Sequence, residues 1–542
     1  MKLSLGDNDV AAIDAPIRSS ERSPKDITEN IISETRQYSE IPHVADRLTL
    51  PIVLVLVVGG LERAAYYAVS APWQNYMQND SESRSPPGAL GLGQATATAI
   101  SNAYLVLSSL TPVPFAIVAD LWLGRYRTLV VGLSLVTLGC IVQLATSLVP
   151  LRLDAGLPGL LVSMILIALG TGGVRTTITP FLAEQSRERE SCVVENADGT
   201  KQFIDSRLTL QLIYNVYYAV INFACLSMVP STLLEKQSGF WASYTLATAC
   251  TSLALAFLIG VSFRLVKVVP GQNILVPAAK VMNNAIRNGF VLDRAKSPYQ
   301  LSQHGISPPY TDAFVDEVRN TMQTCRVLLS FAIFYLCANQ MNNNLVSQAG
   351  QMQLSGIPND MVPVFASVTC CVLAPILQAL WSFLARHKII FSAHFLIEWS
   401  FVMCAVAIAL AAVTQHLIYT SPPCYDRPRT CGPDGRPNKI SVWVQLPTYI
   451  IAALAETVGF VTASEYAYSH SPPNARSMIQ AFSQLAAALG SLLGLATSPA
   501  ARDPWLVVYY GALAGVMLAA AFVFWWFLRK VKANQGGGQH EQ

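Results

Sequence analysis

Long apolar runs recur along almost the whole chain, and they constrain its fold more than any other feature of the sequence. Each of twelve runs, bounded by proline, glycine and clustered charge, is long enough to cross a bilayer as a helix. Only 13% of the residues are charged, whereas soluble proteins have about 25%, so a string of water-soluble domains is excluded. The runs cover residues 50–77, 89–119, 126–148, 157–183, 208–230, 240–265, 327–352, 360–385, 390–416, 441–469, 475–499 and 504–528.

A polar segment of about 60 residues, from Lys267 to Arg326, separates the sixth run from the seventh. We therefore expect an all-α integral membrane protein with twelve transmembrane helices in two six-helix bundles. This is the plan of the major facilitator superfamily fold, whose halves rock around a central site, although a channel or a membrane enzyme could also have twelve spans. The expected parts are a cytosolic N-terminal tail (1–48), a first bundle (49–266), a cytosolic linker (267–325), a second bundle (326–530) and a cytosolic C-terminal tail (531–542).

The basic residues predict the orientation, because short cytosolic loops retain lysine and arginine. With the N-terminus inside the cell, 25 of the 36 basic residues fall in cytosolic tails and loops, so both termini are expected in the cytosol. In this orientation Asn79, which starts the only Asn-x-Ser sequon, is a glycosylation candidate in the first outer loop. Cys424 and Cys431 lie together in another outer loop, where a disulfide could persist.

Charged side chains inside the apolar runs indicate a functional site, because intramembrane charge is costly and marks a bundle interior. In the first run Glu62 and Arg63 are adjacent, and Tyr66 and Tyr67 follow one helical turn later. Apolar residues precede this group and mostly uncharged residues follow it, which favours a place near the middle of the membrane. The alternative is a charge pair near the helix end that snorkels to water.

Two more charged residues lie inside other runs. In the fourth run, three glycines within residues 170–173 would allow close helix contact and would present Arg175 deep in the bundle, unless Arg175 lies at the cytosolic interface. Glu456 is central in the tenth run. Opposite charges in the two halves could hold a solute that carries both an amine and a carboxylate.

Amide side chains also occur inside the runs. Gln340 and Asn344 belong to a row of amides in the seventh run, and Asn222 lies in the fifth. Such groups either join helices through hydrogen bonds or face a solvated ligand site, and the sequence leaves both alternatives open.

Motifs for metal binding and nucleotide hydrolysis are missing from the sequence. The seven histidines lack metal-ligand spacing, no Gly-x-Ser-x-Gly ends a run, and there is no Walker-type phosphate loop. We therefore expect that the protein is not an enzyme and binds no cofactor. An ion gradient is the expected energy source for transport. The net charge of +3 gives no sign of a nucleic-acid partner, so the expected partners are the lipid bilayer, protons and a small solute.

Several motifs resemble those of the proton-coupled oligopeptide transporter (POT/PTR) family, most closely its fungal members. Residues 120–125 with Arg127 resemble the family's loop after the second span, and residues 170–175 with Pro180 resemble its Gly-Thr-Gly-Gly-x-Lys motif. The similarity covers roughly residues 50–530. Further matches are residues 314–319, 339–348, 356–360 and 465–469 with Pro472.

The resemblance implies import of di- and tripeptides with protons by alternating access, in the plasma membrane. It assigns Glu62 and Arg63 to the family's Glu-x-x-Glu-Arg proton-coupling motif. Arg175 stands where the family has a residue that pairs with this motif and approaches the peptide carboxylate. Glu456 stands where the family has the acid that receives the peptide amino group. Contacts with the peptide are also implied for Tyr66, Tyr67, Tyr104, Asn222, Gln340 and Asn344.

The chain departs from the family pattern at two of these functional positions. Gly59 stands where the first acid of the coupling motif is expected, and Arg175 stands in place of a lysine. One proton acceptor is therefore lost, and arginine stays protonated at any relevant pH.

A second hypothesis keeps the fold but changes the cargo to a non-peptide metabolite or anion, with import or export. A third is a nutrient sensor or scaffold that signals through the cytosolic tails.

Overall fold

The computed structural model is almost entirely helical, as the apolar runs predict. The chain divides into two compact units, one of Met1–Arg47 with Glu188–Leu212 and one of Leu48–Arg187 with Ile213–Gln542. The larger unit contains the membrane-spanning helices. The structure describes residues 43–83, 86–186, 192–195, 201–270, 275–289, 291–305, 307–389, 391–428, 436–469 and 476–537.

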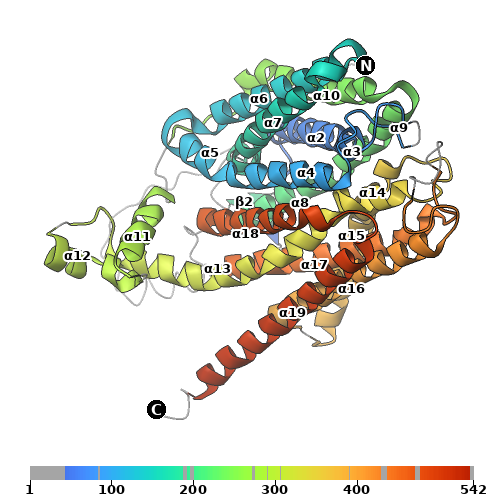
Figure 1. Ribbon diagram of the computed structural model, residues 1–542. Helices are drawn as coiled ribbons and strands as arrows, with labels where there is room; N and C mark the ends of the chain where they lie inside the picture. The colour runs from blue at the N-terminus through green and yellow to red at the C-terminus, as the bar shows by residue number, and fades with distance from the viewer. Residues whose placement is uncertain are drawn as a thin grey trace, which may run out of the picture. The chain divides into compact units, whose positions relative to one another are not determined.

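The N-terminal half of the larger unit consists of helices that follow one another along the chain (Figure 1). They are α2 (Leu50–Ser70), α3 (Trp73–Gln78), α4 (Gln94–Leu110), α5 (Pro112–Val118), α6 (Gly124–Ser147), α7 (Val149–Gln185), α8 (Ser206–Ala224), α9 (Met228–Ser238) and α10 (Phe240–Gly260).

The C-terminal half has a similar succession of helices, and its α18 runs alongside α4 of the N-terminal half (Figure 1). Two short 3-10 turns, η5 (Asn339–Asn342) and η6 (Asn359–Met361), interrupt the helices near the contact between the halves. The helices are α13 (Asp312–Ala338), α14 (Asn344–Gly350), α15 (Val364–Arg386), α16 (Ala393–Thr420), α17 (Leu446–Ser469), α18 (Arg476–Thr497) and α19 (Leu506–Gly537).

Eleven helical stretches among the described residues are long and apolar enough to cross a membrane. One of them, Gln94–Ser147, contains both α4 and α6, which the sequence predicts as separate spans. Gly124 starts α6 with a φ of 75°, a backbone conformation that glycine adopts without strain. Each of the twelve predicted runs therefore contains a long helix, and the predicted fold class is confirmed.

Large apolar side chains remain on the outside of these helices. Phe223 is 74% exposed, and Val508 and Phe522 are each 63% exposed. In water, apolar surface on this scale marks an interaction site or an aggregation hazard, whereas in a bilayer it faces lipid. The protein is therefore a multi-pass membrane protein.

Glycines bring α7 close to its neighbours, as the sequence predicts. A Cβ atom added at Gly170 would lie 2.6 Å from the carbonyl oxygen of Gly132 on α6. At Gly172 it would lie 2.3 Å from Oγ1 of Thr111, where α4 ends. These contacts fix the part of α7 that carries Arg175.

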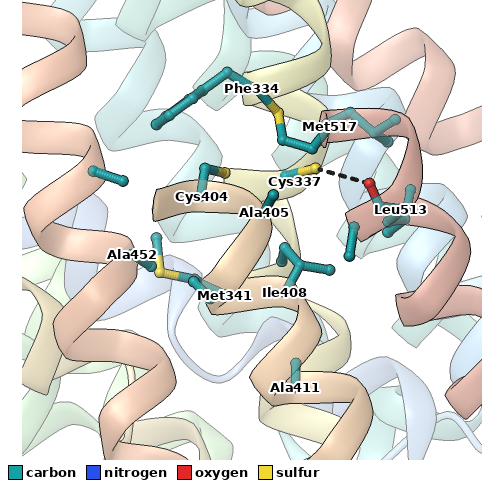
Figure 2. Close-up of a cluster of buried hydrophobic side chains, with 14 of the residues drawn as sticks. Phe334, Cys337, Met341, Cys404, Ala405, Ile408, Ala411, Ala452, Leu513 and Met517 are labelled. Atoms are coloured by element: carbon teal, nitrogen blue, oxygen red, sulfur yellow. Dashed lines mark hydrogen bonds between the residues drawn. The ribbon is translucent and has the colours of Figure 1, made fainter. Parts of the chain in front are cut away.

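The core of the C-terminal half forms where α13, α16, α17 and α19 meet (Figure 2). Cys337 of α13 and Cys404 of α16 are buried there as free thiols. The thiol of Cys337 points toward α19, with its Sγ atom 4.0 Å from the carbonyl oxygen of Leu513. This apolar packing forms the core of the second half.

The predicted linker contains two helices, α11 (Leu275–Arg287) and α12 (Ser297–His304). Nζ of Lys296 donates a hydrogen bond of 3.0 Å to Oδ2 of Asp316, and this hydrogen bond raises the pKa of Lys296. The hydrogen bond from Arg319 lowers the pKa of Asp293. Because α13 already begins at Asp312, part of the predicted linker is continuous with the seventh span. Similarly, α19 continues to Gly537, into the predicted C-terminal tail.

A small sheet in the smaller unit departs from the all-helical expectation. Its strands are β1 (His43–Val44), β2 (Cys192–Glu195) and β3 (Lys201–Ile204), in the order β1-β3-β2. β3 pairs parallel with β1 and antiparallel with β2. Valine, isoleucine and phenylalanine in these short segments favour strands. The long apolar runs of the sequence do not predict strands this short.

Candidate functional site

Glu62 and Arg63 form an ion pair on α2, inside the N-terminal half. Nε of Arg63 lies 2.8 Å from Oε2 of Glu62, and Nη2 donates a hydrogen bond of 3.3 Å to Oε1. The Nε–Oε2 contact is close but not aligned as a hydrogen bond, so it acts through charge alone. Glu62 is fully buried and Arg63 is 7% exposed. Such burial argues against a pair that snorkels to water.

The ring of Tyr66 contacts two arginines. The guanidinium carbons of Arg63 and Arg175 are each 5.6 Å from the ring centroid. Tyr67 packs edge-on against Tyr66, with 5.6 Å between the ring centroids. Because the face of an aromatic ring attracts cations, Tyr66 joins α2 to the arginine of α7.

A cavity of about 100 Å³ lies beside these tyrosines, between the two halves. Tyr66, Tyr67 and Tyr104 line it from the N-terminal half. The C-terminal half contributes three asparagines, Asn339, Asn342 and Asn343, together with Val346, Asp360 and Pro363. We call this space the central cavity; its volume holds several water molecules.

A second cavity, of about 300 Å³, lies between the halves on the other side of Arg175. Arg175 and Thr176 of α7 line it together with Tyr214 in the middle of α8. Gln480 and Gln484 of α18 face them from the C-terminal half. Arg175 thus lines the second cavity and contacts Tyr66 of the central cavity, which places one permanent positive charge at their junction.

Glu456 of α17 is embedded in the C-terminal half. It lines a narrow apolar cavity of about 10 Å³ with Phe334, Met341 and Ala452. No ion pair among the described residues involves Glu456 or Arg175. Tyr335 lies within electrostatic range of both of them. Glu456 and Arg175 are therefore not paired with each other in this conformation, and Tyr335 interacts electrostatically with both.

The predicted amides at the seventh span are used in contacts between helices. Gln340 accepts a hydrogen bond of 2.7 Å from Nδ2 of Asn344. Oδ1 of Asn344 in turn accepts hydrogen bonds from Thr98, at 2.8 Å, and from Gln94, at 3.0 Å. Asn222 donates to the carbonyl of Tyr218 on its own helix, at 2.8 Å. In this conformation none of these three amides lines the central cavity.

Three other asparagines of the seventh-span row line the central cavity. Asn339, Asn342 and Asn343 belong to the same row of amides, but the 3-10 turn η5 and the irregular Asn343 change the direction of successive side chains. In this conformation the central cavity therefore receives other members of the row than Gln340 and Asn344.

The two halves are joined by side-chain hydrogen bonds at one end, which we call the closed end. Asn75 and Asn359 exchange hydrogen bonds of 3.0 and 2.8 Å. Nζ of Lys236 donates to the carbonyl of Gly356 at 2.5 Å. The other contacts of the closed end are Gln78 with Ser347, and Gln94 and Thr98 with Asn344.

Comparison with known proteins identifies the family. The sequence profile of the POT family matches residues 126–509. "Peptide transporter PTR_C" of Candidozyma auris is 35% identical over 524 residues, which cover 95% of this chain and 90% of that protein. "Peptide transporter PTR_A" of the same organism is 32% identical, over 90% of this chain and 83% of that protein. The chain belongs to the POT family.

A solved POT structure has the same fold. The crystal structure of the POT family transporter PepTSo matches with a TM-score of 0.70 and 16% identity, over 90% of this chain and 99% of that one. The major facilitator plan of two helical halves, which the sequence predicts, is thus shared with a solved family member.

The glycine that departs from the POT pattern has a packing role. A Cβ atom at Gly59 would lie 2.8 Å from a ring carbon of Tyr217 and 2.9 Å from Cδ1 of Ile178. α2, α7 and α8 meet closely at this point. The site that an acidic side chain would occupy in the coupling motif is filled here by Tyr217 and Ile178.

Two predicted modification sites lie near the ends of spans. Asn79 is buried, and its Nδ2 atom donates a 3.1 Å hydrogen bond to the carbonyl of Pro87, an arrangement that leaves no access for a glycan. Cys424 is disulfide-bonded. Its predicted partner Cys431 lies outside the described residues, so this pairing stays a prediction.

Proposed function

We propose that this POT family member imports di- or tripeptides with protons by alternating access. The observation that carries the proposal is the arginine at the junction of the two cavities, within 5.6 Å of the Tyr66 ring, combined with family membership. Relatives such as "Peptide transporter PTR_C" are named as peptide transporters. The relationship supports peptides as the first substrate class to test.

The peptide termini would be recognised by opposite charges. Arg175 presents a planar guanidinium that can hold a carboxylate through two hydrogen bonds. Glu456, on the other half, would receive the amino group once the halves approach around a bound peptide. The tyrosines and asparagines of the central cavity offer hydroxyl and amide groups for the peptide backbone.

The cytosol would lie on the side of the second cavity. The excess of lysine and arginine in the predicted cytosolic loops supports cytosolic termini. With this orientation the closed end faces outward, and the conformation is one in which the route from outside is shut. The plasma membrane is the proposed location, where an inward proton gradient is available.

Uptake of a labelled dipeptide into proteoliposomes with acidic medium outside tests the proposal. We expect uptake above that of empty vesicles, and loss of proton-driven uptake in Glu456→Gln. Glu398→Gln is the matched control, because Glu398 is another acid of the C-terminal half and lines neither the central nor the second cavity. Correctly inserted protein without uptake would refute peptide transport.

A second candidate is a non-peptide anion or metabolite, in either direction. The observation that favours it is the pairing of a permanently charged Arg175 with the loss of an acid at Gly59. A panel of organic anions and small metabolites, tested as competitors of dipeptide uptake, distinguishes the two candidates. Transport of an anion that lacks an amino group, with no uptake of any peptide, would favour this second function.

A further inference from the structure

Two carboxyl groups meet at the closed end, one from each half. Glu235 lies near the end of α9 in the N-terminal half, and Asp360 lies in η6 of the C-terminal half. α9 and η6 contact each other, and the amide of Asn75 donates hydrogen bonds both to Glu235 and to Asn359, the neighbour of Asp360, so the two carboxyls lie close together. Glu235 is 2% exposed and Asp360 is 1% exposed.

Few hydrogen-bond donors among the described residues contact these two carboxyls. Nδ2 of Asn75 donates to Oε1 of Glu235 at 3.3 Å. Oε2 of Glu235 and both oxygens of Asp360 accept no well-aligned hydrogen bond from a donor in the described residues. Asp360 is therefore a buried acid without a hydrogen-bond partner among the described residues, and a second buried acid lies nearby.

No cation in the described part of the chain pairs with either carboxyl. Lys236 is next to Glu235 in the chain, but its Nζ atom is bonded to the carbonyl of Gly356. The other titratable groups that face the pair are phenols, Tyr244 of α10 and its neighbour Tyr76 of α3. The segment from η5 through α14 to η6 adds no titratable side chain besides Asp360.

Two carboxylates in a buried site without a cation repel strongly, and they approach within hydrogen-bond distance when one proton lies between them. A proton held by this pair would therefore stabilise the closed end. If the proton leaves, repulsion between the two halves favours separation at this end.

The position of the pair suits a proton that crosses from one side to the other. Glu235 lines a cavity of about 360 Å³ at the closed end, with Thr232, Lys236 and Gly356. Asp360 lines the central cavity on the opposite side of the contact. One carboxyl thus faces each space, and each space has room for water.

We propose that Glu235 and Asp360 form a proton-binding site that closes the outer end of the transporter. A proton from outside water binds the pair as the halves meet, and it leaves from Asp360 to water in the central cavity. Without the proton the two carboxylates repel each other, and the outer end reopens. This role rests on the proposed proton-coupled transport, but it adds a site outside the coupling motif and Glu456.

The distance between the halves tests the site without any substrate. Donor and acceptor dyes are attached through non-canonical amino acids at Ser81 and Ser355, two exposed positions at the closed end. The full-length protein in lipid nanodiscs should show a short distance in acid and a longer one as pH rises. This readout stands even if no peptide is transported, so failure of the peptide assignment and failure of the proton site are distinguishable.

Neutral isosteres should remove the pH dependence. In Glu235→Gln the amide can donate to the Asp360 carboxylate and replace the shared proton, so the short distance should persist at every pH. Asp360→Asn should act in the same way and guards against misfolding of one variant. Glu82→Gln, at an exposed acid of the same end, should keep the wild-type curve. A wild-type pH response retained in both Glu235→Gln and Asp360→Asn, or no response in the wild type, would overturn the proposal.

Discussion

The ring of Tyr66 and the guanidinium of Arg175 lie 5.6 Å apart, where the central cavity meets the second cavity. Arg63, which is paired with Glu62, lies at the same distance from the same ring. One aromatic side chain thereby connects the buried ion pair of α2 with the cation that we propose as the carboxylate site.

Loss of the Tyr66 ring should weaken substrate binding. Cation–π contacts contribute about 0.5–2 kcal/mol, so Tyr66→Ala should raise KM roughly 2- to 30-fold. Tyr66→Phe keeps the ring face and should stay near the wild-type value. Initial rates of dipeptide uptake over a range of concentrations measure both. Equal loss in the two variants would assign the effect to the hydroxyl group instead.

Restoring the family acid at Gly59 should fail for steric reasons. Because Tyr217 and Ile178 occupy the space, Gly59→Glu should destabilise the fold by about 1–3 kcal/mol, the usual cost of overpacking. Thermal unfolding of the purified protein in detergent measures the loss. Gly511→Ala is the control, since nothing lies within 4 Å of a Cβ atom there. An equally stable Gly59→Glu with altered proton coupling would show that the pocket readily rearranges.

The hydrogen bond between Thr98 and Asn344 should bias the equilibrium between conformations. A side-chain hydrogen bond between membrane helices contributes about 0.6 kcal/mol, so Thr98→Val should shift the balance at the closed end roughly threefold toward open. The dye distance between Ser81 and Ser355 reports this shift. Thr245→Val is a suitable control, because Thr245 bonds only within its own helix at Trp241. No difference between the two variants would contradict a role of Thr98 in closing.

The arginine that replaces the family lysine should bind the peptide carboxylate through its planar pair of donors. In Arg175→Lys the charge remains, but the planar two-donor geometry is lost. We expect weaker binding of the peptide, measured as a higher KM, with a similar maximal rate. An amidated dipeptide, which lacks the carboxylate, should be transported equally poorly by both proteins. A marked preference of the wild type for the amidated peptide would disprove the contact.

The membrane fold was predictable because the pattern of apolar runs depends on composition over twenty residues and hardly on exact contacts. Glu62 and Arg63 were found for the same reason, since a charge within a long apolar run stands out. The Glu235–Asp360 pair was missed because both acids lie at span ends, where charge is ordinary, and only folding brings them together. The sequence identifies the row of amides that contains Asn339 but not which of its members line the cavity, because η5 interrupts the helix there. The packing role of Gly59 depends on Tyr217, a residue distant in the chain.

The most direct test of the account is concentrative uptake of a labelled dipeptide by the purified protein in proteoliposomes. With acid outside and a negative potential inside, we predict accumulation of the peptide above its outside concentration and collapse of this gradient on addition of a protonophore. Accumulation that persists after the protonophore, or uptake no higher than that of empty vesicles, would contradict it.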